Sequence, residues 1–129
     1  MNIGKAAKLS NLTIKAVRYY ANIGLVKPQQ NISTGYRNYT DEELAKLKFI
    51  GKARKFDFSI NECKELLSLY EDKNRTSKEV KKITLEKISQ IDGKLKDLKD
   101  LKKELNFLAS NCHGDDRPNC PILEELSNN

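Results

Sequence analysis

The feature that most constrains this chain is a long amphipathic segment over residues 77–109. Apolar side chains recur there at steps of three or four through the main stretch, and charged side chains fill most of the rest. The apolar set is Val80, Ile83, Ile88, Ile91, Leu95, Leu98, Leu101, Leu105 and Leu108. This spacing predicts a coiled-coil helix. Roughly 33 residues at about 1.5 Å each make a rod of about 50 Å, too long for a small domain to cover. A second copy would bury the stripe, so we expect a homodimer.

Positive charge is concentrated in the first half of the 129 residues. Residues 1–59 contain 11 Lys or Arg and 4 Asp or Glu, although the whole chain carries a net charge of only +6. A basic module joined to a nearly neutral one is typical of a nucleic-acid-binding protein with an attached sensing or pairing element. The alternative is a lysine-rich surface that is merely solvated.

Basic residues also bear on the cellular compartment. Four of them interrupt the first twenty positions, and no later stretch approaches the ~20 apolar residues of a membrane span. We therefore expect no secretory signal, no membrane partner, and a cytoplasmic protein whose thiols stay reduced.

The N-terminal residues have the outline of a helix-turn-helix. Residues 3–9 predict a short helix, Ser10 and Asn11 break it, and Thr13 is a good N-cap for a second helix through about Ala21. Gly24 is expected to end that second helix. Short β-type runs at 25–26 and 36–39 flank a polar, turn-rich stretch, which predicts a hairpin wing.

Three later helices begin with a recognisable signal. Thr40, Ser59 and Thr76 are each followed three residues later by Glu, which is the spacing of a capping box. The predicted helices run over about 41–55, 60–71 and 77–109. In the second of these, Cys63 and Tyr70 fall on the apolar stripe, and we interpret Cys63 as a small buried hydrophobic residue.

The other two cysteines lie in the stretch NCHGDDRPNC, residues 111–120. A disulfide, a metal site and an idle loop would all be compatible with Cys112 and Cys120, but reduced thiols disfavour the disulfide. Gly114 can supply a tight turn that folds the loop back. Pro121 then predicts a short helix over 121–127, whose N-terminus favours a thiolate at Cys120.

These motifs together resemble a known family. IGKAAKLSNLTIKAVRYYANIGLVKP, then GYRNYTDEEL, then a long helix and a cysteine loop resemble the MerR family of bacterial transcription regulators over essentially the whole chain. NCHGDDRPNCPILEEL resembles the loop of its copper-efflux branch. The resemblance implies a mainly α fold with three parts. They are a winged helix-turn-helix DNA-binding domain (1–74), a long antiparallel coiled-coil dimerisation helix (75–111), and a metal-binding loop with a short C-terminal helix (112–129).

The resemblance also implies roles for individual residues. It places DNA contacts on the recognition helix, the wing and the third helix; these are Lys15, Arg18, Tyr20, Tyr36, Arg37, Tyr39 and Arg54, with Lys5 as a weaker candidate. Arg and Tyr side chains on an exposed helix and wing suit phosphates, and a few would read base edges. The tyrosines could instead pack the hairpin onto the helices.

The donor set of the loop favours a soft monovalent ion. Zinc prefers four ligands, whereas Cys112 and Cys120 offer two thiolates. His113 is a weak third candidate, and Asp115 or Asp116 could add hard oxygens. Thiolates select Cu(I), and d¹⁰ monovalent ions accept two ligands. Members of the family that answer divalent metals often carry a cysteine where Ser77 stands in this chain. Lys81 is expected to supply a counter-charge near the site.

The sequence therefore predicts a Cu(I)-responsive regulator, with Ag(I) or Au(I) as further ligands. The resemblance to the family implies that it binds double-stranded promoter DNA as a dimer, distorts it for RNA polymerase, and activates copper-efflux or detoxification genes. Within the family, the alternative is a Zn, Cd, Pb or redox sensor. Outside it, the alternatives are a thiol metallochaperone or enzyme and a coiled-coil adaptor. The chain has no C-x-x-C pair and no Gly-rich phosphate loop, so we predict no enzymatic activity.

Overall fold

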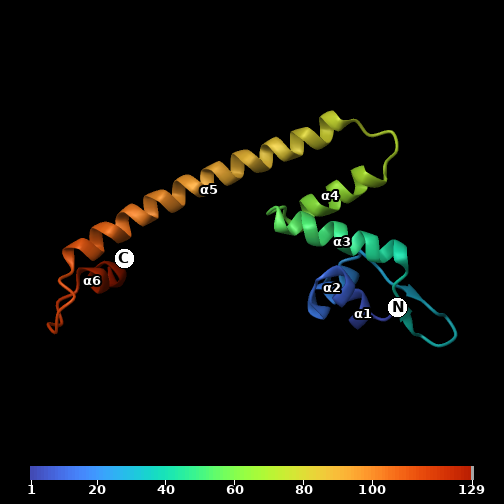
Figure 1. The fold of residues 1–129 in the computed structure, drawn as a ribbon, viewed down its shortest axis with the longest axis horizontal. Coiled ribbons are helices and arrows are strands. Elements are labelled where there is room, and N and C mark those ends of the chain that lie inside the picture. The colour runs from blue at the N-terminus through green and yellow to red at the C-terminus, as the bar shows by residue number, and fades with distance from the viewer. Residues whose placement is uncertain (129) are drawn as a thin grey trace. The chain divides into compact units, whose positions relative to one another are not determined.

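The computed structural model describes residues 1–128 and divides the chain into two compact units, Met1–Lys82 and a second unit that begins at Ile83. The first unit holds four helices and a hairpin: α1 (Ile3–Ser10), α2 (Ile14–Asn22), β1 (Gln29–Gln30), β2 (Arg37–Asn38), α3 (Asp41–Lys55) and α4 (Ile60–Glu71). Helix α5 (Ser77–Asn111) follows, and α6 (Pro121–Ser127) lies in the second unit (Figure 1). The predicted class, mainly α with a winged helix-turn-helix and a long helix, is confirmed.

The core of the first unit lies where α1 packs on α2 and α3, and where α3 packs on α4. Its fully buried side chains come from all of these elements and from the segments around the hairpin; the largest are Tyr39, Leu47, Ile50, Val17, Val26 and Cys63. The prediction that Cys63 is a buried hydrophobic residue is confirmed, since none of its surface is exposed. The recognition-type helix α2 is therefore held on a scaffold formed by α1 and α3.

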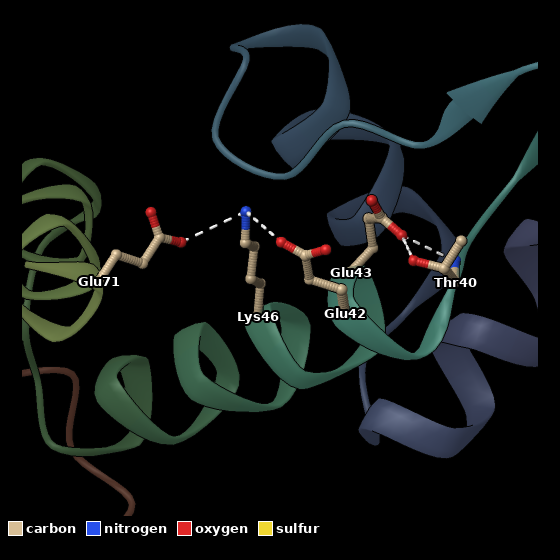
Figure 2. Close-up of polar contacts among 5 residues, drawn as sticks. All are labelled: Thr40, Glu42, Glu43, Lys46 and Glu71. Carbon is tan, nitrogen blue, oxygen red and sulfur yellow. Dashed lines mark hydrogen bonds and ion pairs between the residues drawn. The ribbon is translucent and has the colours of Figure 1, made fainter.

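Capping side chains fix where the helices of this unit begin. The backbone N–H of Thr40 donates to a carboxylate oxygen of Glu43 at 2.8 Å, and the hydroxyl of Thr40 contacts the same oxygen (Figure 2). Ser59 and Glu62 form the same reciprocal box at the start of α4. At α5, the hydroxyl of Thr76 accepts from Glu79 N at 3.4 Å.

An ion-pair bridge links α3 to α4. Lys46 Nζ lies 3.3 Å from a carboxylate oxygen of Glu71 and 3.8 Å from one of Glu42, as the dashed lines in Figure 2 mark. On the same side of the pair, the rings of Phe49 and Tyr70 lie 5.2 Å apart between centroids. The prediction that Tyr70 points inward is wrong, because 64% of its surface is exposed. Its ring lies at the edge of the α3–α4 packing.

The predicted position of the first wing strand is also wrong. Residues 25–26 form a turn, and the strand that pairs with Arg37–Asn38 is Gln29–Gln30, in antiparallel register. The reason is that the N–H groups of Leu25 and Val26 donate to the carbonyl of Tyr20 and close the end of α2. Val26 then enters the core, so the hairpin starts beyond Pro28.

In the second unit, α5 continues as one uninterrupted helix to Asn111 (Figure 1). Several large apolar side chains of its later turns are at least half exposed, among them Leu95, Leu98, Leu101 and Leu105. None of the helices in residues 1–128 is both long and apolar enough to span a bilayer.

Candidate nucleic-acid interface and metal site

Helix α2 presents a basic, exposed face. Thr13 caps it by accepting from Ala16 N at 3.0 Å, which confirms the predicted helix start. Lys15 and Arg18 are exposed, whereas Val17 and Tyr20 turn into the core. The capped start and the buried side together hold the two basic side chains in a fixed orientation toward solvent.

Arg54 ties α2 to the turn between α3 and α4. Its Nη1 donates to the carbonyl of Phe58 at 2.8 Å, and its guanidinium lies close enough to Tyr20 to act on the pKa of that phenol. Burial raises the pKa of Tyr20, and the nearby Arg54 charge opposes that rise. Arg54 is also exposed, and its predicted contact with a phosphate stays a prediction.

The wing brings two more of the predicted DNA-contact residues next to that face. Tyr36 and Arg37 are exposed, while only 1% of the surface of Tyr39 is exposed. Burial raises the pKa of Tyr39, and the charges of Arg37 and Arg18 oppose the rise. Residues from α2 and from the wing thus share one electropositive neighbourhood. Tyr20 and Tyr39 contribute their rings to the core beneath it, and their contact with DNA stays a prediction.

A row of basic side chains on α3 was not predicted from the sequence. Lys48, Lys52 and Lys55 line a groove of about 320 Å³ that runs along the α1–α2 turn. Gly51 lies against that turn, where an added Cβ would stand 3.3 Å from Leu12. The spacing of the three lysines on one helix face was a visible signal for this surface.

The two-cysteine loop places its thiols side by side. Cys112 follows the end of α5, and Cys120 is the N-cap residue of α6. The Sγ atoms of Cys112 and Cys120 lie 3.9 Å apart, and both cysteines are free. Gly114 turns the chain between them with a φ of +64°, in the left-handed region that favours glycine.

Local electrostatics favour a thiolate at Cys120. The backbone N–H of Leu123 lowers the pKa of the Cys120 thiol; partial burial opposes this effect, and Cys112 and the N–H of Ile122 add to it. These N–H groups belong to the first turn of α6, so their effect is that of a helix N-terminus on an anion. Elsewhere in the loop, Asp115 and Arg117 pair with each other at 2.7 Å, so the carboxylate of Asp115 already has a partner. The soft donors of the loop are its two thiols.

The donor set fits a thiophilic metal ion. A metal–thiolate bond of about 2.3 Å allows two sulfurs on one ion to lie no more than about 4.6 Å apart. The separation of Cys112 and Cys120 is within that limit. Within residues 1–128, no three His, Cys, Asp or Glu side chains gather as a metal-binding group. His113 is exposed and does not complete such a group.

Ser77 and Lys81 both lie, exposed, in the first turns of α5, whereas Cys112 follows its last residue. The predicted role of these two residues at the metal site stays a prediction.

Two family models match the chain. Residues 1–70 match the MerR HTH family regulatory protein, and residues 44–108 match the family described as MerR, DNA binding. The fold, the basic face of α2 and these matches define a winged-helix, DNA-binding transcription regulator. The chain belongs to the MerR family. Its relatives are regulators and not enzymes.

Two curated relatives match over nearly the full chain. The HTH-type transcriptional regulator HmrR of Rhizobium leguminosarum bv. viciae is 47% identical over 127 residues, which are 98% of this chain and 98% of that protein. The HTH-type transcriptional regulator CueR of Salmonella typhimurium is 42% identical over 127 residues, which are 98% of this chain and 92% of that protein.

Solved structures agree with the fold. The transcription regulator PbrR691 from Ralstonia metallidurans CH34, crystallised with lead(II), matches with a TM-score of 0.83 and 29% identity, over 98% of this chain and 99% of that one. EcmrR in a complex with DNA matches with a TM-score of 0.67 and 30% identity, over 85% of this chain and 38% of that one.

Proposed function

We propose that this protein is a Cu(I)-responsive transcription activator that binds promoter DNA as a homodimer in the cytoplasm. The observation that carries the choice of ion is the number of donors: the thiols of Cys112 and Cys120 come together, with no third donor grouped beside them among residues 1–128. Two thiolates satisfy a soft monovalent ion, whereas zinc favours four ligands. The similarity to HmrR and CueR supports the part of the proposal that makes this chain a transcription regulator.

The homodimer is supported by the exposed stripe on α5. Leu95, Leu98, Leu101 and Leu105 are each 50–61% exposed in the single chain. A continuous apolar stripe at this spacing is stable when a second helix covers it. We infer that two copies of α5 pair antiparallel and hold two basic heads at the separation that symmetric half-sites require.

Cys112 and Cys120 would hold the ion, and the ion would supply one positive charge between two thiolates. Cys120 is the N-cap of α6, so the loop and the helix are connected directly. We propose that closure of the loop carries α6 against the dimerisation helices. In an antiparallel pair, the start of α5 in one copy lies near the end of α5 in the other. Ser77 and Lys81 of each copy would therefore lie near the cysteine loop of the other copy.

The output of this change would be the shape of the promoter. Lys15, Arg18, Arg37 and Arg54 grip the DNA in both states, and a change in the angle between heads bends and untwists the DNA between half-sites. RNA polymerase would then engage both promoter elements, and copper-efflux or detoxification genes would be activated.

A second candidate is a sensor of divalent metals. The observation in its favour is the similarity to PbrR691, which was crystallised with lead(II). Ser77 at the start of α5 disfavours it, because serine supplies no third thiolate there. X-ray absorption of the copper-loaded protein separates the two: two sulfur neighbours support the Cu(I) proposal, and four mixed ligands contradict it.

The decisive functional test uses Cys112→Ser in a reporter assay. We expect metal-dependent transcription to be abolished while the metal-free protein still binds its promoter. A variant that switches normally with copper would contradict the sensor proposal. Failure of the wild-type protein to bind promoter DNA under any salt condition would contradict the DNA-binding proposal itself.

A further inference from the structure

Ile32 is the most exposed large apolar side chain of the first unit. All of its surface is exposed, whereas the next most exposed, Tyr36, is 77% exposed. Ile32 lies in the turn that joins β1 to β2, at the tip of the wing. The sequence pattern does not indicate a role for Ile32, because the other residues from Gln29 to Gly35 are polar or glycine, as in an ordinary loop.

The turn that carries Ile32 is built by its own hydrogen bonds. The side-chain oxygen of Asn31 accepts from the backbone N–H of Ser33 at 2.9 Å and of Thr34 at 3.2 Å. The backbone N–H of Asn31 donates to the carbonyl of Tyr36 at 2.9 Å, and its carbonyl accepts from Gly35 at 2.8 Å. Gly35 takes a φ of +73°, which glycine adopts without strain. The tip is thus a defined turn with an apolar side chain directed into solvent.

The chemistry of this tip differs from that of the rest of the wing. Residues 29–35 carry no charge, and the nearest cations in the sequence are Lys27 before them and Arg37 after them. A phosphate contact by the tip would call for a Lys or Arg. An isolated isoleucine at the tip suits an apolar surface that a narrow projection can reach.

We propose that Ile32 enters the minor groove of the bound DNA and makes an apolar contact with its walls. The inference rests on the proposed DNA-binding function. The hairpin lies beside the end of α2, since Gln30 and Arg37 line one pocket together with Asn22. With α2 in the major groove, this arrangement would direct the tip of the hairpin toward the neighbouring groove. The minor groove is about 6 Å wide and admits a slim side chain. Apolar wedges, isoleucine among them, are a common device of minor-groove binding and ease bending of the duplex.

An apolar contact and a phosphate contact differ in how the DNA affinity depends on salt concentration. An apolar interaction releases no counterions, so Ile32→Ser lowers affinity by about tenfold and leaves the slope of log K against log salt unchanged. Arg37→Gln, by comparison, lowers the steepness of that slope by about 0.9 for each phosphate that the protein no longer neutralises. The two variants on one hairpin therefore give different signatures.

The experiment measures fluorescence anisotropy of a labelled duplex that the wild-type protein has selected from a randomised library. Ser33→Ala is the matched control, because the turn uses the backbone N–H of Ser33, which alanine retains. A second duplex carries inosine for guanosine opposite the wing, which removes an amino group from the minor groove alone. We expect this change to alter wild-type affinity and to have a smaller effect on Ile32→Ser.

Two outcomes overturn the inference. One is equal affinity of Ile32→Ser and wild type; if such a variant also fails to activate transcription, the tip belongs to a protein partner instead. The other is an inosine effect of the same size in both proteins. If the wild-type protein selects no duplex, the proposed DNA-binding function fails, and this result is distinct from the other two.

Discussion

The Sγ atom of Cys112 lies 3.9 Å from that of Cys120, across a loop that joins the end of α5 to the start of α6. Both sulfurs are free thiols, and the approach is close enough for one metal ion to bridge them. If this pair holds the ion as proposed, metal binding depends on both residues, because neither has a substitute ligand grouped beside it in residues 1–128.

We therefore expect Cys112→Ser and Cys120→Ser each to abolish tight Cu(I) binding. A single remaining thiolate cannot satisfy a two-coordinate ion. Competition against a Cu(I) chelator at a buffered free-ion level measures the change in affinity. Cys63→Ala is the matched control: its thiol is fully buried among core residues, so the variant should keep metal affinity and be somewhat less stable. Tight binding by either loop variant would show that another donor completes the site.

The three thiols should also differ in reactivity. Cys112 and Cys120 are partly exposed, whereas Cys63 has no exposed surface. Brief treatment of the reduced, metal-free protein with iodoacetamide should label two cysteines, and the third only after denaturation. Peptide mass mapping identifies which residues react. Rapid labelling of Cys63 in the native protein would contradict the packing of α4.

The helices were predictable because their signals are local. The boxes at Thr40 and Ser59 depend on residues three positions apart, and the structure confirms both. The wing was harder. Its first strand was placed at residues 25–26 because those side chains favour strands, but the N–H groups there donate to the carbonyl of Tyr20. That interaction spans five to six residues and depends on how α2 ends.

For the candidate site, too, local features were predictable and features that depend on the fold were not. Sequence predicted that Cys112 and Cys120 belong to one loop, but their close approach depends on the turn at Gly114 and on α6. Burial is harder to predict, because it depends on the whole fold: the sequence did not indicate that only 1% of the surface of Tyr39 is exposed, or that Ile32 is fully exposed. The DNA contact of Tyr39 stays a prediction.

The capping box of α3 should contribute measurably to stability. Glu43→Ala removes the acceptor for both the backbone N–H and the hydroxyl of Thr40. We expect the free energy of unfolding to fall by about 1–2 kcal/mol, measured by urea denaturation at fixed protein concentration.

Glu42→Ala is the control for that variant. Glu42 is adjacent in sequence, and its ion pair with Lys46 is at 3.8 Å and largely exposed, so removing it should cost at most about 0.5 kcal/mol. Equal effects of the two substitutions would show that charge near the helix start, and not the box, supplies the stability.

Two glycines should respond to alanine in opposite directions. Gly93 lies inside α5, and no atom is within 4 Å of the position of an added Cβ. Because glycine disfavours a helix interior, Gly93→Ala should raise the free energy of unfolding by about 0.5–1 kcal/mol.

Gly114 also has open space around it, but its φ is +64°. Alanine there is strained, so Gly114→Ala should destabilise the loop conformation and weaken Cu(I) binding. Thermal unfolding and the chelator competition, at one protein concentration, measure the two effects. Weaker thermal stability of Gly93→Ala would mean that the partner helix packs against that position.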